Sequence, residues 1–482
     1  MKKRLIAALL CVVMIPQGIA HDLPDLGDSA SSELSPLAEQ RLGAQIMRDI
    51  RWKDAAYLRD PEVEDYLNWL GDRLVAAGPG AGLPFQFFGV NDPTLNAFAM
   101  PGGNIGVLTG LILAAQSESE LAGVLGHEVS HVTQRHIARM LGKQSQTGML
   151  MLASLLVAVL AAKSSAQVSQ AAISAGMAAG MSTQLSYSRD FENEADRLGV
   201  QNLAAAGFDV RGMVGFFERL QKNARLYENN APAYMRTHPL TSDRITEMEN
   251  RVAQMPYRQV PDSLDFQLVR AKLKVGRQPS REVIAEFEAA ARGSSPSVAA
   301  QYGLVRAYLQ TRRLADADRE MVELRKRHAL SAMIDGLEGD LRIAHGDPAG
   351  AARLFREARA RFPQSHRLMY GEIEALIDSG KAADALTAVK AELQTTAGDA
   401  TLWEFRARAE AALGKRLGQH RALGEVYAIQ GNYAASAEQF ALAQTAGDGD
   451  FFEQSAVDSR LREVRALLAE QMREMRESRG QR

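Results

Sequence analysis

Gly126-His127-Glu128-Val129-Ser130-His131 is the stretch around which this chain is organised. On a helix, two imidazoles four residues apart share one face, so His127 and His131 can bind one zinc ion while Glu128 reaches the water beside it. The chain has nine histidines among 482 residues, and on the order of 0.01 matches to this pattern are expected by chance. The stretch therefore predicts a helical site for one zinc ion per chain, with Glu128 as the general base.

The third zinc ligand must come from elsewhere, because two histidines leave tetrahedral zinc one protein ligand short and one position open for water. Glu192 is the best candidate, in a helical stretch that begins at Ser188. Asp196 follows four residues later on the same face, and we expect it to accept a hydrogen bond from a ligand histidine and fix its tautomer. Glu194 is two residues from Glu192, so we expect it to be a solvated helix residue.

The helix that carries the zinc motif is expected to run from residue 118 to about residue 141, because the apolar residues before and after the motif keep a helical period. His136 would then lie on the same helix, five residues after His131. This spacing turns the His136 side chain well away from the metal face. We therefore expect a surface or capping role for His136 and not ligation.

The N-terminus has the composition of a secretory signal. Basic residues 2–4 precede an apolar run over 5–15 and a small-residue site at 18–20, which predicts a cleaved signal over residues 1–20 and a mobile leader over 21–36. The single cysteine, Cys11, falls inside that signal, and a chain without thiols suits the oxidising periplasm. The net charge of -2 gives no basic surface for nucleic acid, so nucleic-acid binding is set aside.

A change in amino-acid composition and pattern near residue 261 predicts two large domains. The first, a zinc metallopeptidase domain over 37–260, should be mainly helical with a small β-sheet from strands at 85–90 and 106–109, joined through 96–103. The strand and loop over 97–109 suit an edge strand that pairs with an extended substrate, or an ordinary strand beside the core. The apolar run 149–162 is shorter than a bilayer span, so a buried helix is favoured, with a peripheral membrane contact left open.

The second domain, over 262–482, is expected to be an α-solenoid of tetratricopeptide repeats, with a non-repeating helical bundle as the alternative. Small and large residues alternate in the order that packed helix pairs need, and we expect about four to six pairs, capped by an amphipathic helix over 461–475. The sharpest units place Gly424 with Phe440 and Gly339 with Phe355. The fold class is therefore mainly α, a zincin-type domain followed by a solenoid.

Four motifs together carry a family resemblance: His127 to His131, Glu192 to Asp196, Asn96 to Gly103, and Thr237-His238-Pro239 with Arg244-Ile245. They resemble the gluzincin peptidases, which include the CAAX prenyl protease and the heat-shock membrane protease HtpX. The resemblance implies that His238 stabilises the oxyanion, with Arg244 a weaker candidate for this contact. It also implies a second role for His238, as an extra zinc ligand that holds the enzyme off.

Two functions remain open at this point. In the first, suggested by exported members with C-terminal repeats, the chain is a periplasmic zinc endopeptidase for misfolded or stalled outer-membrane proteins, and its repeats contact substrates or the outer-membrane assembly machinery. In the second, the chain is a non-proteolytic adaptor or chaperone with a latent metal site. The intact glutamate of the zinc motif favours the first, because a structural zinc site needs no general base.

Overall fold

The computed structural model describes residues 34–78, 80, 82–141, 188–225, 233–293, 297–327 and 330–480. The expected signal over 1–20, most of the expected leader and the apolar run 149–162 lie outside these residues. Within the described ranges, no helix combines the length and the hydrophobicity that crossing a membrane requires.

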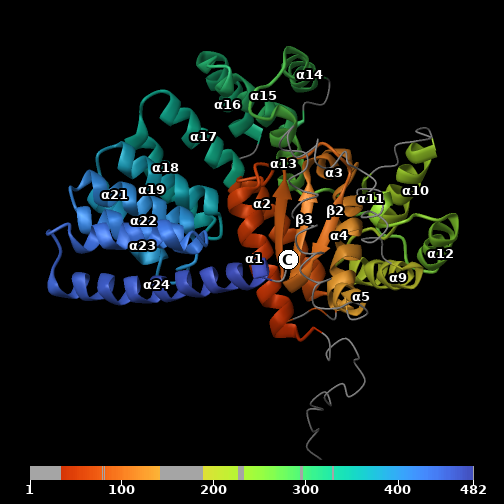
Figure 1. Cartoon of the computed structure of the whole chain (residues 1–482). Helices are drawn as coiled ribbons and strands as arrows, with labels where there is room; N and C mark the ends of the chain where they lie inside the picture. The colour runs from red at the N-terminus through yellow and green to blue at the C-terminus, as the bar shows by residue number, and fades with distance from the viewer. Residues whose placement is uncertain are drawn as a thin grey trace, which may run out of the picture.

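A three-stranded sheet lies at the centre of the first domain, in the order β1-β3-β2 (Figure 1). Strand β3 (Asn104–Leu108) pairs in parallel with β1 (Gln86–Val90) and antiparallel with β2 (Ala97–Met100). The two expected strands are confirmed, and the expected connection between them contains a strand of its own. Burial alternates at the start of this connecting segment, as in a strand, since Ala97 and Ala99 are buried while Phe98 between them is half-buried. Strand β2 therefore forms one edge of the sheet.

Helices surround this sheet in the first domain (Figure 1), and serine, threonine or aspartate side chains cap the N-termini of five of them. They are α1 (Pro36–Lys53), α2 (Pro61–Ala76), η1 (Pro101–Gly103), α3 (Thr109–Ala114), α4 (Glu118–Thr133), α5 (His136–Leu141), α9 (Arg189–Ala205), α10 (Arg211–Arg225), α11 (Ala233–Thr237) and α12 (Ser242–Ala253). Helix α4 packs against β2, α9 and α10, and α2 packs against β1. The zinc motif thus lies on a helix that is covered by structure on several sides.

The single helix expected over 118–141 is interrupted, so that expectation is wrong. Helix α4 ends at Thr133, and Arg135 adopts a left-handed backbone with φ of 51° before α5 begins at His136. The Arg135 guanidinium donates a hydrogen bond of 2.6 Å to the Leu34 carbonyl and pairs with Glu39 at 3.4 Å. These contacts hold an unfavourable backbone conformation in place, and the chain direction changes just after the zinc motif.

The second part of the chain is a helical array that extends to one side of the sheet (Figure 1). Its helices are α13 (Leu264–Val275), α14 (Arg281–Arg292), α15 (Val298–Gln310), α16 (Leu314–Arg327), α17 (Ala332–Ala344), α18 (Pro348–Arg361), α19 (His366–Asp378), α20 (Ala382–Glu392), α21 (Ala400–Ala412), α22 (Arg416–Ile429), α23 (Tyr433–Gln444) and α24 (Phe451–Gly480). The expected capping helix over 461–475 is the middle of the longer α24. The fold class predicted from the sequence is confirmed.

Glycine allows the close packing that the repeat pattern predicted. A Cβ atom on Gly339 would lie 2.2 Å from the Phe355 ring, and one on Gly424 would lie 2.8 Å from the Phe440 ring. Both phenylalanines are fully buried. The small residue in one helix and the large residue in the next therefore fit each other, as the repeat architecture requires.

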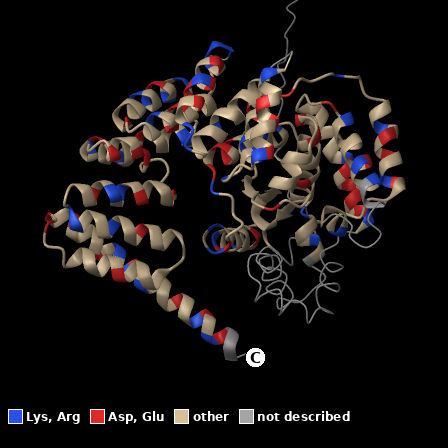
Figure 2. Cartoon of the chain, turned by 90° about the horizontal axis from the view of Figure 1, so that it is seen from above, with Lys and Arg blue, Asp and Glu red and all other residues tan. Residues whose placement is uncertain are grey.

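Charged residues of both signs are interspersed along the helices of both parts (Figure 2).

One buried ionic cluster joins the two parts. Lys272 on α13 lies 2.5 Å from Asp60 and 2.5 Å from Glu62, at the start of α2, and its side chain is only 6% exposed. Buried apolar residues continue from Val63 on α2 to Leu341 on α17 in one cluster. The first repeats and the sheet domain therefore share a core, and the boundary near residue 261 stays a prediction.

Replacement of Lys272 by Met should lower the free energy of unfolding by about 3 kcal/mol, because it removes the ammonium group that pairs directly with two largely buried carboxylates. Lys274→Met on the same helix is the matched control, since the Lys274 side chain is 42% exposed and its pair with Glu286 should contribute at most about 1 kcal/mol. Thermal and urea unfolding of both variants measure the difference. Equal loss in the two variants would contradict a stabilising role for the buried cluster.

Candidate metal centre

Two glycines let the helices that carry the site approach closely. Helices α4 and α9 cross where Gly126 faces Gly199, and a Cβ atom on Gly199 would lie 3.1 Å from the backbone nitrogen of His127. Larger side chains at this crossing would push the helices apart. The close approach brings Glu192, two turns before Gly199 on α9, to the two histidines of α4.

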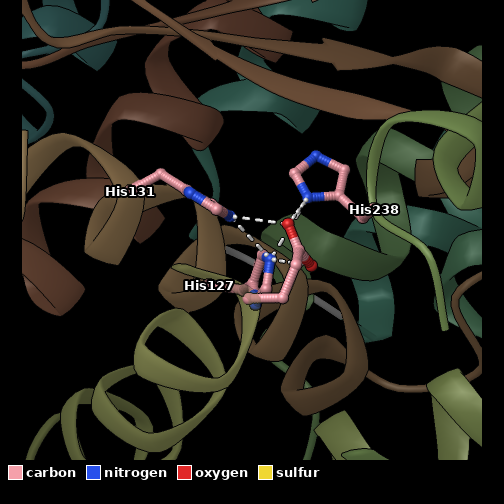
Figure 3. A group of neighbouring side chains, drawn as sticks. His127, His131 and His238 are labelled. Atoms are coloured by element: carbon pink, nitrogen blue, oxygen red, sulfur yellow. Dashed lines mark hydrogen bonds and ion pairs between the residues drawn. The ribbon is translucent and has the colours of Figure 1, made fainter. Parts of the chain in front are cut away.

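Four buried side chains meet at this crossing: His127, His131, Glu192 and His238, with one candidate ligand atom from each lying within 4.8 Å of the others. The Glu192 carboxylate lies 3.5 Å from Nε2 of both His127 and His131. His238 follows α11, and its Nδ1 lies 3.0 Å from Glu192 Oε1. Figure 3 shows the three imidazoles directed toward one carboxylate. The structure thus brings together the expected ligands and the loop histidine.

The donor set fits zinc. The Nε2 atoms of His127 and His131 face each other at 2.9 Å, an unfavourable arrangement for two lone pairs unless a proton or a cation lies between them. The Nδ1 atom of His127 lies 3.0 Å from Asp196 Oδ1, a contact that favours a proton on Nδ1 and so makes Nε2 the atom that can bind a metal. Two imidazoles and a carboxylate are a common ligand set for catalytic zinc.

The titration properties of the metal-free cluster show how strongly its groups interact. Burial alone would lower the pKa of His127, but hydrogen bonds to Asp196 and Glu192 outweigh it and raise that pKa to about 9. Burial and the charge on His127 hold the pKa of His131 well below its usual value. Burial opposes ionisation of Glu192 as well, yet the neighbouring histidines His238 and His127 lower its pKa. Zinc must therefore displace a proton when it binds.

Glu128 has the environment of a general base. It is fully buried, and neither carboxylate oxygen makes a hydrogen bond of normal geometry to a described residue. Burial raises the pKa of Glu128, while the charges of His238 and His127 and the backbone amide of Ala99 on β2 moderate the rise. Nε2 of His238 lies 3.6 Å from Glu128 Oε1. A carboxylate with a raised pKa and free lone pairs is suited to accept a proton.

The Arg244 guanidinium forms hydrogen bonds and ion pairs with other groups of the site. Its Nε and Nη2 donate to the two oxygens of Asp196 at 2.7 and 2.8 Å, and its Nη1 donates to the Pro239 carbonyl at 2.7 Å. Nη1 also lies 2.6 Å from Glu192 Oε2. These contacts argue against the expected oxyanion contact and favour a positioning role. Arg244 connects the His238 loop to Asp196, which itself holds His127.

The surface role expected for His136 is wrong. His136 is fully buried, its Nδ1 lies 2.9 Å from Nδ1 of His131, and its Nε2 lies 3.0 Å from Glu194 Oε2. The left-handed Arg135 turns the chain back toward the site, which the spacing argument for one continuous helix could not include. Glu194 also differs from expectation, because its side chain is only 29% exposed and accepts hydrogen bonds from His136 and Arg139.

Tyr234 is a further site residue that the sequence did not single out. It lies four residues before His238 on α11, and the His238 amide donates to its carbonyl at 2.8 Å. The fully buried Tyr234 ring stacks on the His238 ring with a centroid distance of 4.6 Å. Its four-residue spacing from His238 was a signal for this contact, but only once a helix had been predicted there.

Comparison with known proteins gives a consistent result. Residues 61–252 match the model of peptidase family M48, and residues 342–409 match a tetratricopeptide repeat model. The beta-barrel assembly-enhancing protease of Escherichia coli is 31% identical over 479 residues, with 97% of each chain covered. A Vibrio cholerae protein of the same designation is 32% identical over 458 residues, with 94% of each covered. The mitochondrial metalloendopeptidase OMA1 of Arabidopsis thaliana is 30% identical over 223 residues, 46% of this chain and 43% of that protein.

Replacement of Arg244 by Lys should destabilise the protein by about 3 kcal/mol, because one ammonium group cannot replace the fork that holds Asp196 and the His238 loop. The same variant should cleave casein at least about tenfold more slowly, since Asp196 and the His238 loop would no longer be held in their positions beside the proposed ligands. Arg251→Lys on the same helix is the control, because the Arg251 side chain is 38% exposed and its ion pair within the described part of the chain is with the half-exposed Glu247. Thermal unfolding and cleavage rates that match those of wild type would contradict the positioning role.

Proposed function

Because the chain belongs to peptidase family M48 and, over nearly its whole length, to the beta-barrel assembly-enhancing proteases, we propose that it degrades misfolded or stalled outer-membrane proteins in the periplasm. It is a zinc metalloendopeptidase with a repeat array. The observation that carries the proposal is the buried cluster of two imidazoles and a carboxylate beside the buried Glu128 carboxylate, whose pKa is raised by burial. Such a group suits peptide hydrolysis better than a purely structural metal site.

The proposed zinc ligands are His127, His131 and Glu192. Their support is the short distances between their ligand atoms, and the contact of Asp196 with His127 Nδ1, which leaves Nε2 as the atom of this ring that faces the other ligands. The bound ion would supply Lewis-acid activation of the scissile carbonyl and of water. The protein contributes the fixed orientation of the ligands and the burial that keeps bulk solvent away.

Glu128 is the proposed general base and acid. It accepts the proton of the attacking water and returns it to the leaving amine, which its raised pKa and free oxygens support. His238 has two candidate roles. Its Nδ1 lies 3.3 Å from His127 Nε2 and 3.0 Å from Glu192, which supports an extra ligand in the resting enzyme. Its Nε2 lies 3.6 Å from Glu128, which suits a donor to the developing oxyanion.

Strand β2 is the proposed binding site for the substrate backbone. It forms an edge of the sheet beside α4, and its Ala99 lies close to the carboxylate of Glu128. An extended segment that adds to this edge would place a peptide bond next to the general base. Recognition through main-chain hydrogen bonds depends little on sequence, which suits an enzyme that removes many different unfolded chains.

The proposed division of labour places catalysis in residues 37–260 and substrate or partner contact in residues 262–482. A cavity of about 560 Å³ lies between the two parts, with Trp52 and Tyr57 on one side and Tyr370 and Glu404 on the other. The outer-membrane assembly machinery as a partner is inferred from the name of the Escherichia coli relative. The periplasmic location is supported by the composition of the first 20 residues.

The Glu128→Gln variant should lose cleavage of casein by at least about 100-fold, because the amide cannot accept the proton. It should keep one zinc per chain, since Glu128 is not among the proposed ligands. Glu247→Gln, on the exposed face of α12, is the control and should cleave at the wild-type rate. Zinc content and cleavage are measured on the same preparations, and an active Glu128→Gln protein would refute the proposed mechanism.

The His238→Ala variant separates the two roles of this residue. If His238 holds the resting enzyme off, its removal should raise basal casein cleavage several-fold, because the extra ligand no longer competes for the metal. A fall of about 10-fold or more in turnover would instead support the oxyanion role. An unchanged rate contradicts both roles.

A non-proteolytic adaptor function is the second candidate, favoured by the large array and the cavity beside it. A strain that lacks the protein and shows defective outer-membrane protein assembly distinguishes the two candidates. Complementation by wild type but not by Glu128→Gln supports the protease. Full complementation by Glu128→Gln would show that the physiological activity is that of the adaptor.

A further inference from the structure

We propose that His136 is a positioning residue that fixes the tautomer of His131 and so directs the His131 Nε2 lone pair toward zinc. The relay runs from His131 Nδ1 to His136 Nδ1 at 2.9 Å, and from His136 Nε2 to Glu194 Oε2 at 3.0 Å. This inference rests on the zinc site of the proposed function, and adds to it a requirement for two residues that bind neither metal nor substrate.

The hydrogen-bond directions follow from the chemistry of the groups. The Glu194 carboxylate is an acceptor, so His136 Nε2 is the donor in that contact. A neutral His136 then has a lone pair on Nδ1, and His131 Nδ1 must donate its proton to it. With its proton on Nδ1, His131 presents the lone pair of Nε2, the atom that lies 3.5 Å from Glu192. The relay thus selects the tautomer of His131 that can bind a metal.

The position of the His136 ring is fixed on both sides. The left-handed Arg135 turns the chain so that His136 faces back toward α4. The His136 ring stacks on the Phe191 ring with a centroid distance of 4.4 Å and an interplanar angle of 10°. Arg139 lies 3.0 Å from the same Glu194 oxygen and keeps this carboxylate beside the histidine. A ring held in this way loses little entropy when its hydrogen bonds form.

The Nδ1 atoms of the two expected zinc histidines therefore contact different groups. His127 Nδ1 contacts the Asp196 carboxylate directly, at 3.0 Å. His131 reaches the Glu194 carboxylate through the imidazole of His136. Both arrangements end at a carboxylate from α9, the helix that also supplies Glu192. Helix α9 thus orients both histidines of α4 as well as offering the third ligand.

Two substitutions of His136 separate hydrogen bonding from packing. His136→Asn keeps an acceptor oxygen near the position of Nδ1 but loses the stack on Phe191. His136→Phe keeps the stack but removes the acceptor. The relay predicts that the Phe variant binds zinc about 10- to 100-fold more weakly than wild type, whereas the Asn variant stays within about 3-fold of wild type. A packing role predicts the reverse order.

Glu194→Leu tests the outer end of the relay at a partly exposed position, where a folding defect is less of a concern. Without the Glu194 carboxylate, the proton of neutral His136 can move from Nε2 to Nδ1. It would then face the Nδ1 proton of His131, and the hydrogen bond between the two rings would be lost. Zinc affinity should fall at least about 3-fold in this variant. His345→Phe in the array is the matched control, because the exposed His345 imidazole pairs with the exposed Asp318, far along the chain from the site. This variant should bind zinc as wild type does.

The experiment is a competition titration of the metal-free full chain against a chromophoric zinc chelator at constant pH, with the cobalt(II) absorption spectrum as a second readout. Thermal unfolding of each metal-free variant shows whether it is folded. Weak zinc binding by folded Phe and Leu variants, with recovery in the Asn variant, supports the relay. Wild-type affinity in the Phe and Leu variants overturns it. Absence of zinc binding by wild type would instead refute the proposed function.

Discussion

The close crossing of α4 and α9 at Gly126 and Gly199 is the constraint on which the rest of the structure depends. It brings a helix with two histidines against a helix whose Glu192, Glu194 and Asp196 all contact histidines of the site, and burying such polar groups is costly unless they are paired. Asp196 lies 3.0 Å from His127 Nδ1, and Arg244 in turn pairs with Asp196. The buried cluster is therefore a consequence of helix packing, and its four candidate ligand residues are those that could hold a metal ion.

The inner part of this site could be predicted from the sequence because its signals are local. The spacing of His127 and His131 on one helix turn and the four-residue step from Glu192 to Asp196 need no knowledge of the tertiary fold. The place of His136 could not be predicted in this way. It depends on a left-handed arginine, Arg135, whose conformation is held by contacts with residues about 100 positions earlier in the chain. An edge strand is expected within 97–109, with residues 97–100 as part of a connection; those residues instead form the edge strand β2, and β3 lies in the centre of the sheet.

The repeat array illustrates the same distinction between local and long-range information. Pairs such as Gly339 with Phe355 follow a repeating pattern, so the architecture was evident from the sequence. The way in which the array joins the sheet domain was not, because it depends on a buried lysine, Lys272, whose two carboxylate partners lie more than 200 residues earlier. The shared core and this cluster connect substrate or partner contacts in the array to the position of α2, which packs beside β1 and α4.

The central claim is that one zinc ion is held by two imidazoles of α4 and the Glu192 carboxylate of α9. Elemental analysis of the purified full chain beside its Glu192→Ala variant, both dialysed against a weak chelator, tests it most directly. The account predicts one zinc per chain in wild type and a large loss of zinc from the folded variant. Wild-type protein without stoichiometric zinc, or a Glu192→Ala protein that keeps its full zinc content, would contradict it.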